Sequence, residues 1–181
     1  MIKVITVVGT RPEIIRLSCL IKELEQTTNH ILVHTGQNYD KNLSDIFFAD
    51  LGLRKPDYYL GIANKTLGGF IGKCFIEIES ILIKEKPEAV IILGDTNSAF
   101  TSIIATRMKI PVYHLEAGNR CFDSNVPEEI NRRIIDHSSA FNLVYTEAAR
   151  RNLLQEGIDS RRIFLIGSPL QEVVKDISGK V

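Results

Sequence analysis

The feature that most constrains the fold is a regular alternation of short β-branched runs with helical patterns along nearly the whole chain. Most of the runs are almost continuously apolar, which is typical of parallel strands buried on both faces. The strands are expected at residues 3–8, 30–34, 89–93, 112–115, 142–145 and 162–166. Helical patterns cover residues 12–26, 40–50, 66–84, 98–109, 127–137 and 147–156, and a last one begins at 169. The chain is therefore predicted to form an α/β fold, a Rossmann-like parallel sheet with helices on both faces.

Composition excludes several classes of protein. The 181 residues suffice for one large domain, and 22 basic residues balance 22 acidic ones. This balance argues against nucleic-acid binding, because affinity for a duplex comes mainly from Lys and Arg at phosphates. No apolar run reaches the ~20 residues that span a bilayer, so no membrane partner is expected. Three scattered cysteines, Cys19, Cys74 and Cys121, fit reduced thiols better than a disulfide framework. With no recognisable signal peptide, the chain is expected to be cytoplasmic.

The loop after the first strand is a candidate anion site, because open parallel sheets bind ligands beyond the carboxyl ends of their strands. Its sequence is Gly9-Thr10-Arg11-Pro12-Glu13. A glycine turn that leads into a helix presents backbone N–H groups to an anion, and Arg11 adds further donors. Arg16 follows about a turn and a half later on the same helix. The loop is neither a dinucleotide fingerprint nor a Walker A loop, so phosphate binding and an ordinary turn with solvated arginines both stay open.

Two further loops carry single polar candidates. The loop at residues 35–40 contains Gln37, which suits a sugar or nucleotide, and ends at Asp40, which suits a helix cap; on sequence alone the cap is favoured. The loop at 94–98 places Asp95 directly after the most apolar strand. Burial would raise the pKa of such a carboxyl and a helix N-terminus would lower it. A structural cap and a functional carboxylate are both compatible with Asp95.

The loop after residues 112–115 is the richest in polar groups. Glu116 lies at the strand end, and Glu128 and Glu129 lie at the start of the next helix. Several such groups at the exits of adjacent strands indicate a pocket. Two carboxylates, one of them kept protonated, can remove and return a proton as base and acid. The sequence holds no competing Ser-His-Asp set, Cys-His pair or metal-binding spacing, so no metal is expected.

Taken together, these motifs resemble a known family, the non-hydrolysing UDP-N-acetylglucosamine 2-epimerases. The resemblance covers the whole chain in the correct order. It rests on Gly9-Thr10-Arg11-Pro12-Glu13, Thr35-Gly36-Gln37, Gly94-Asp95-Thr96, Glu116-Ala117-Gly118, Pro127-Glu128-Glu129-Ile130-Asn131-Arg132 and the stretch from Thr146 to Gly157. The variant at 116–123, with Val126 before Pro-Glu-Glu, is most similar to a branch that converts UDP-2-acetamido-2,6-dideoxy-talose to UDP-N-acetylfucosamine for surface polysaccharides such as capsule and O-antigen.

The resemblance implies a GT-B-like enzyme of two Rossmann-type domains with a UDP-sugar between them. Residues 1–181 would be the N-terminal domain, and the C-terminal nucleotide-binding domain is absent from this chain. The family reaction inverts C2 through elimination of UDP to a glycal and re-addition, and it requires no cofactor. The isolated domain is then expected to be inactive, and a homodimer is implied. The alternatives are a non-catalytic module that binds a nucleotide sugar or a partner, and half of a glycosyltransferase.

Three carboxylates match the acid/base positions of the family. They are Asp95, Glu116 and Glu128. Glu116 and Asp95 are expected to form the proton-transfer pair, with Glu128 supporting or sharing that role.

Five further residues are expected to contact the substrate. Arg11 and Arg16 match basic positions that face UDP in the family, although family members more often carry lysine where Arg16 stands. Gln37, Arg120 and Arg132 are the weaker candidates.

Overall fold

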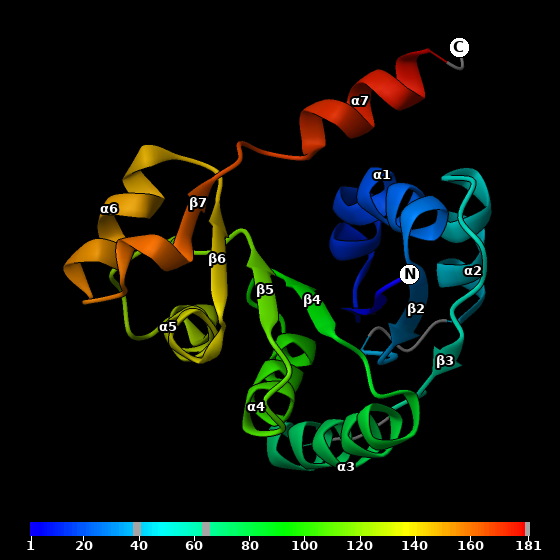
Figure 1. The fold of residues 1–181 in the computed structure, drawn as a ribbon, viewed down its shortest axis with the longest axis horizontal. Coiled ribbons are helices and arrows are strands. Elements are labelled where there is room, and N and C mark those ends of the chain that lie inside the picture. Colours follow the sequence, from blue (N-terminus) through cyan, green and yellow to red (C-terminus); the bar gives the residue numbers. More distant parts are fainter. Residues whose placement is uncertain (38–40, 63–65, 180–181) are drawn as a thin grey trace.

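The computed structural model describes residues 1–37, 41–62 and 66–179, and its centre is one seven-stranded parallel sheet (Figure 1). The strand order is β3-β2-β1-β4-β5-β6-β7. The strands are β1 (Lys3–Val8), β2 (Asn29–His34), β3 (Tyr58–Tyr59), β4 (Ala89–Leu93), β5 (Val112–Leu115), β6 (Phe141–Val144) and β7 (Ile163–Leu165). The predicted α/β class with a doubly wound parallel sheet is confirmed.

Helices connect the strands and cover both faces of the sheet (Figure 1). They are α1 (Arg11–Thr27), α2 (Lys41–Asp50), α3 (Leu67–Glu85), α4 (Thr101–Arg107), α5 (Pro127–Ser138), α6 (Glu147–Gln155) and α7 (Leu170–Ser178). Two short 3-10 helices, η1 (Asn97–Phe100) and η2 (Ser160–Arg162), precede α4 and β7.

Most predicted elements are present with ends shifted by about one residue, and some differ more. The strand β3 was not predicted, because its two residues are too few to show a periodicity. The helix predicted at 98–109 is divided into η1 and α4, and α4 ends at Arg107, two residues before Lys109 adopts a left-handed φ of 66°. The predicted strand 162–166 is shorter, since Arg162 belongs to η2, and β6 begins one residue early. The predicted cap Asp40 lies outside the described residues.

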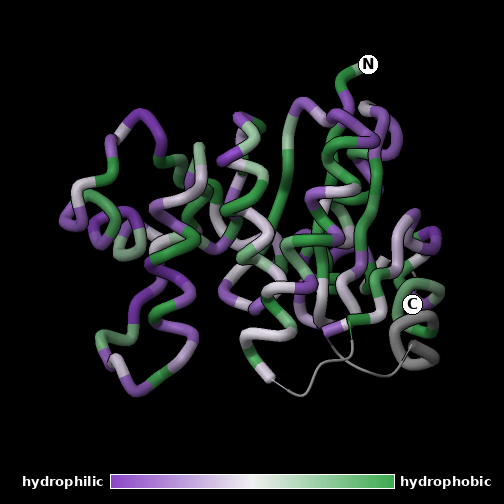
Figure 2. Tube along the Cα trace, turned by 90° about the horizontal axis from the view of Figure 1, so that it is seen from below, coloured by the Kyte–Doolittle hydropathy of each residue, from purple (hydrophilic) through white to green (hydrophobic). Residues whose placement is uncertain are grey.

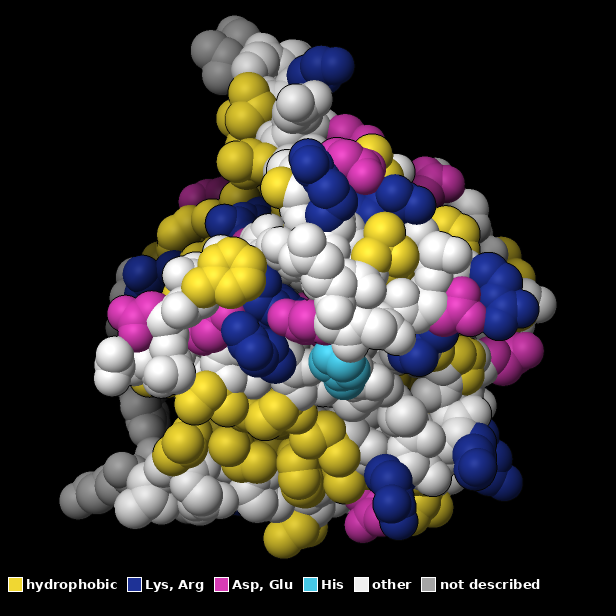
Figure 3. Space-filling view, turned by 90° about the vertical axis from the view of Figure 1, so that its left-hand side faces the viewer, with side chains coloured by type: hydrophobic (Ala, Val, Ile, Leu, Met, Phe, Trp, Pro, Cys, Tyr) yellow, Lys and Arg dark blue, Asp and Glu magenta, His cyan; other side chains and the backbone are white. Residues whose placement is uncertain are grey.

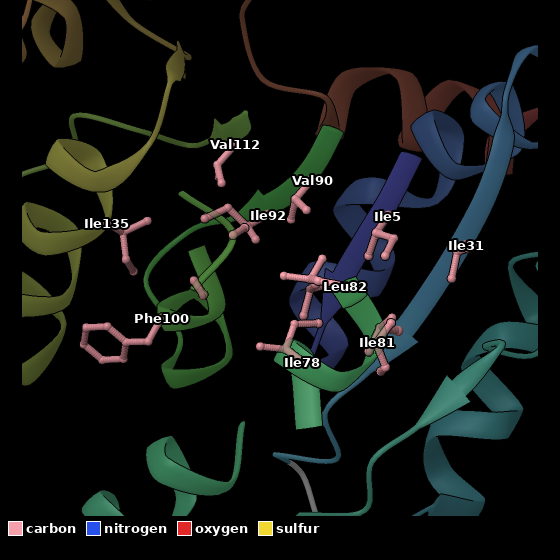
Figure 4. Packing of buried hydrophobic residues seen from close by; sticks show 14 residues of the cluster. Ile5, Ile31, Ile78, Ile81, Leu82, Val90, Ile92, Phe100, Val112 and Ile135 are labelled. Atoms are coloured by element: carbon pink, nitrogen blue, oxygen red, sulfur yellow. The ribbon is translucent and has the colours of Figure 1, made fainter. Parts of the chain in front are cut away.

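Alternate residues of the central strands fill two separate apolar layers. On one face, Ile5 and Val90 pack against Ile78, Ile81 and Leu82 of α3, as the close view shows (Figure 4). The opposite face packs against α1 and α2. Figure 2 shows the same arrangement as hydrophobic strands in the middle of the molecule with more polar segments around them. Burial on both faces explains why these strands read as continuous apolar runs.

The last two elements lie apart, with β7 at the edge of the sheet beside β6 and α7 against α1 (Figure 1). The helix α7 packs against α1, where Lys22 Nζ lies 2.8 Å from Asp176 Oδ2. Exposed apolar side chains follow one another along β7 and α7: Phe164, Leu165, Ile166, Leu170, Val174 and Ile177. Figure 3 shows hydrophobic side chains on the projecting α7 segment at the top of that view. Every helix among the described residues is too short or too polar to cross a bilayer.

Candidate functional site

The loops that carry the candidate residues converge at the carboxyl edge of the parallel sheet. In the strand order, β1 lies between β2 and β4, so the direction of winding reverses between β1 and β4. Such a switch point opens a crevice in which α/β proteins bind ligands. The loops after β1, β2, β4 and β5 all border it.

The first loop is held by the buried carboxylate of Glu13. Its Oε2 accepts the N–H groups of Gly9 at 2.9 Å and Thr10 at 2.6 Å, and its Oε1 accepts the hydroxyl of Thr96 at 2.9 Å. Burial raises the pKa of Glu13 to about 7, and these hydrogen bonds offset only part of that effect. Glu13 therefore joins the loop after β1 to the loop after β4. A Cβ on Gly9 would lie 1.9 Å from Ser98 Oγ, so the close approach of the two loops requires glycine.

The two arginines of this loop have different environments. Arg11, in the first turn of α1, places its guanidinium carbon 5.6 Å from the ring centroid of Phe47. Arg16, about a turn and a half later, forms an ion pair with Glu116 at the end of β5. Both side chains lie at the crevice edge of α1, which keeps two positive charges beside the helix N-terminus. This arrangement suits a diphosphate.

Gln37 belongs to a polar contact between the loops after β2 and β4. Its Oε1 accepts the N–H of Ser98 at 3.2 Å and the hydroxyl of Ser98 at 2.9 Å. The hydroxyls of Thr35 and Ser98 also lie 2.7 Å apart. The side-chain carbonyl of Gln37 is thus used within the protein, and Gln37 helps to position the loops.

Glu116 has an unusual backbone and a defined partner. Its φ of 66° is in the left-handed region, which a residue other than glycine adopts at a cost. Its side chain is 19% exposed and pairs with Arg16. Tyr145, which follows β6, lies near the same pair: burial, and to a lesser degree the charge of Glu116, raises the pKa of its phenol, while Arg16 acts against both. Sequence reasoning missed Tyr145, whose only signal is its place directly after a strand.

Asp95 is held by α5. Its Oδ2 lies 2.8 Å from Nε and 2.7 Å from Nη2 of Arg132, and its backbone carbonyl accepts the amide of Asn131 at 2.8 Å. The side chains of Asp95 and Arg132 are 28% and 22% exposed, so both stay accessible from the crevice. Asp95 and Glu116 are thus carboxylates at the ends of neighbouring strands, each paired with an arginine from a helix.

The two acids at the start of α5 lie in opposite environments. The side chain of Glu128 is exposed and forms no hydrogen bond or ion pair with another described residue. Glu129 is buried and accepts the backbone N–H of Cys121 at 3.0 Å. Burial by itself would raise the pKa of Glu129, but hydrogen bonds from Cys121 and Arg133 together with the charge of Arg120 lower it to about 2. Glu129 therefore has a structural role. The sequence alone did not distinguish it from its exposed neighbour Glu128.

Arg120 does not reach the crevice. Its guanidinium is fully buried, 2.8 Å from Asp136 and 2.6 Å from Glu156. The expected substrate contact conflicts with this position, because the charge is already neutralised by two carboxylates inside the protein. Among the described residues, no group of three or more side chains is arranged to hold a metal ion.

Comparison with known proteins relates this geometry to one family. Residues 22–181 match the family described as UDP-N-acetylglucosamine 2-epimerase. The chain is 46% identical over 170 residues to the UDP-N-acetylglucosamine 2-epimerase of Methanocaldococcus jannaschii, a match that covers 93% of this chain and 46% of the relative. It is 41% identical over 175 residues to the UDP-2,3-diacetamido-2,3-dideoxy-D-glucuronate 2-epimerase of Pseudomonas aeruginosa, covering 94% and 49%.

Solved structures give the same relationship. The UDP-N-acetylglucosamine 2-epimerase from Rickettsia bellii superposes with a TM-score of 0.94 at 52% identity, over 99% of this chain and 48% of that one. The Methanocaldococcus jannaschii enzyme in complex with UDP-GlcNAc and UDP superposes with a TM-score of 0.94 at 43% identity, over 99% and 51%. The chain spans about half the length of the relatives that it matches.

Proposed function

The chain belongs to the UDP-N-acetylglucosamine 2-epimerase family, and we propose that it forms the carboxylate-bearing N-terminal domain of a UDP-sugar 2-epimerase. The observation that carries the proposal is the placement of Asp95 and Glu116 at the ends of the neighbouring strands β4 and β5, each beside an arginine. Inversion at a carbon requires a proton to leave from one face and return to the other. A pair of carboxylates in one crevice is suited to this task.

The reaction is proposed to proceed by elimination and re-addition. A carboxylate takes the C2 proton while the C1–O bond breaks, UDP leaves with the electron pair, and a C1–C2 double bond forms. UDP then bonds again to C1 while the other carboxyl delivers a proton to C2 from the opposite face. A C2–H beside an acetamido nitrogen is not acidic, so the positive character that develops at C1 as UDP leaves is what makes this proton removable. No net oxidation occurs, and the proposal names no cofactor.

The binding groups have distinct proposed roles. Arg11 and Arg16, beside the N-terminus of α1, are proposed to face the diphosphate, where they stabilise the charge that builds up on departing UDP. Arg132 is proposed to orient the carboxylate of Asp95 until substrate enters. Glu128 keeps a supporting role in the proposal, since it is exposed at the edge of α5. Gln37 is proposed to act through Ser98, and Arg120 to act only structurally.

A second domain is proposed to complete the crevice. The relatives are about twice as long as this chain, and the exposed apolar side chains of β7 and α7 form a surface that a further domain would cover. Without it, the diphosphate would be gripped from one side only. The chain alone is therefore proposed to bind UDP-sugars weakly and to catalyse no epimerisation.

The substrate is proposed to be a UDP-N-acetylhexosamine, and the 6-deoxy-talose derivative is the finer proposal from the variant at 116–123. A cytoplasmic place in the synthesis of surface-polysaccharide precursors and a homodimeric state are proposed on the same resemblance. Side-by-side assays with UDP-N-acetylglucosamine, the 2,3-diacetamido glucuronate derivative and the 6-deoxy-talose derivative rank the substrates. Light scattering tests the dimer.

Deuterium exchange at C2 tests the proposed reaction. The chain alone is compared with a hybrid in which residues 1–181 replace the corresponding half of the Methanocaldococcus jannaschii epimerase. We expect the hybrid, and not the chain alone, to incorporate solvent deuterium at C2 of a UDP-sugar. A hybrid that binds UDP but exchanges none of the three sugars would leave a non-catalytic binding module as the better description.

A further inference from the structure

The buried residue His114 connects the two loops that carry the candidate acids. His114 lies on β5 and is 1% exposed, between β4 on one side and β6 on the other. Its Nε2 lies 2.8 Å from the carbonyl oxygen of Gly94, the residue before Asp95. A carbonyl oxygen only accepts hydrogen bonds, so Nε2 carries the proton and donates it. One ring nitrogen of His114 thus holds the backbone from which Asp95 projects.

The other ring nitrogen faces Asp136 of α5. Nδ1 lies 2.8 Å from Asp136 Oδ1, a close ion-pair contact outside the angles of an aligned hydrogen bond. Both atoms are buried, which makes the contact costly to break without a replacement partner.

Asp136 in turn holds the loop after β5. Its two carboxylate oxygens lie 3.3 and 3.2 Å from the N–H of Gly118, two residues after Glu116. Arg120, from the same loop, adds a contact of 2.8 Å to Asp136 Oδ2. Glu116 needs such support, because its left-handed φ of 66° is unfavourable for a side chain other than hydrogen.

We propose that His114 and Asp136 are positioning residues that fix the loops of Asp95 and Glu116 relative to each other, and this inference rests on the proposed function of those two acids. The arginines Arg132 and Arg16 orient the carboxylates from the crevice side, whereas His114 and Asp136 hold the backbone from inside. Proton transfer depends on this spacing, since a misplacement of about 1 Å can cost ~100-fold in rate.

Two substitutions of His114 separate its contacts. The amide nitrogen of glutamine reaches about as far as Nε2 and that of asparagine about as far as Nδ1. His114→Gln therefore keeps the contact to Gly94 and loses the one to Asp136, and His114→Asn does the reverse. Ile135→Val is the control, because it removes one buried methyl group beside Asp136 and touches neither contact.

Amide hydrogen exchange in the 181-residue chain is the decisive measurement. The reporters are the N–H of Gly94, which donates to Leu115 O at 2.9 Å, and the N–H of Gly118. In His114→Gln, we expect the exchange rate at Gly118 to rise at least tenfold more than the change in global stability alone would produce. The exchange rate at Gly94 should change only as much as global stability does. His114→Asn should do the opposite, and Ile135→Val should change both sites only as much as global stability does. Exchange that follows global stability at both sites in both His114 variants would overturn the proposal.

Two further measurements keep the proposal testable if the His114 variants misfold or if the proposed function is wrong. In the unaltered chain, ¹⁵N spectra of the His114 ring should show a protonated Nε2, and an unprotonated Nε2 would overturn the proposal without any variant. In the hybrid, both His114 variants should lower kcat for C2 exchange by about 10- to 100-fold with KM within about threefold. An inactive parent hybrid would instead contradict the proposed function, and hydrogen exchange in the chain alone would still decide the positioning role.

Discussion

Arg16 and Glu116 lie 100 residues apart in the chain and form an ion pair across the carboxyl edge of the sheet. Arg16 comes from the helix after β1, and Glu116 comes from the loop after β5. With Asp95 and Arg132, they place two carboxylates and two guanidinium groups around a single crevice. A diphosphate would compete with Glu116 for Arg16 and release this carboxylate, which links substrate binding to the appearance of a free base.

Glu13 should make stability depend on pH near neutrality. Its pKa is raised from 4.5 to about 7 in the folded chain, so folding favours its protonated form. This contribution is fully present below pH 4.5 and is lost as the pH rises through 7. At ~1.4 kcal/mol per pKa unit, the total change is on the order of 3 kcal/mol.

Urea unfolding of the chain and of Glu13→Gln at several pH values checks this expectation. The free energy of unfolding of the unaltered chain, minus that of Glu13→Gln, should fall as the pH rises from 4.5 to 7.5, because only the unaltered chain loses a proton at position 13. The contributions of other groups cancel in this difference. A difference that stays constant across this range would show that Glu13 does not titrate there.

Glu129 and Glu128 form a matched pair of adjacent acids. Glu129→Gln should lower the free energy of unfolding at pH 7 by about 1–3 kcal/mol, because buried donors from Cys121 and Arg133 lose a charged acceptor. Glu128→Gln changes an exposed side chain and should stay within about 0.5 kcal/mol. The pKa of Glu129 is lowered to about 2, so its contribution should persist above pH 4.5 and disappear as the pH falls toward 2. Equal effects of the two substitutions would contradict the structure.

Gly118 should tolerate no side chain. Its φ is 77°, and an added Cβ would lie 2.4 Å from the carbonyl oxygen of Ala149. Gly52 is the control, since its φ of 65° is similar but its Cβ would meet nothing within 4 Å. Gly52→Ala should cost about 1–2 kcal/mol from the left-handed backbone alone. Gly118→Ala should lower the free energy of unfolding by at least about 1 kcal/mol more than Gly52→Ala does, as measured by thermal or urea unfolding. Equal losses in the two variants would contradict the predicted clash with Ala149 of α6.

Much of the fold could be predicted from the sequence, because continuous apolar strands and capped helices are local patterns. The helix α1 shows this well: it was predicted at residues 12–26 and spans Arg11–Thr27, with Pro12 and Glu13 in its first turn. The two-residue strand β3 lacked a pattern, and its pairing with β2 depends on the rest of the sheet.

The site could be predicted only in part, because contacts between residues far apart in the sequence leave no local pattern. Asp95 and Glu116 were identified as candidates, but their pairing with Arg132 and Arg16 follows from the order of the strands. Arg120 was expected at the substrate and is buried between Asp136 and Glu156, since its burial depends on α5 and α6. His114 reads as an ordinary strand residue, and its two contacts exist only once β4 and α5 flank it.

The central claim is that Glu116 and Asp95 move the proton at C2, and deuterium exchange in the hybrid with Glu116→Gln and Asp95→Asn tests it most directly. General acid–base catalysis contributes about 10²- to 10⁴-fold, so each substitution should slow exchange at C2 by at least ~100-fold. The Kd for UDP should not rise by more than about threefold in either variant, because neither acid is proposed to bind the diphosphate and Glu116→Gln removes a competitor for Arg16. Exchange at the parental rate in either variant would contradict the role of that carboxylate.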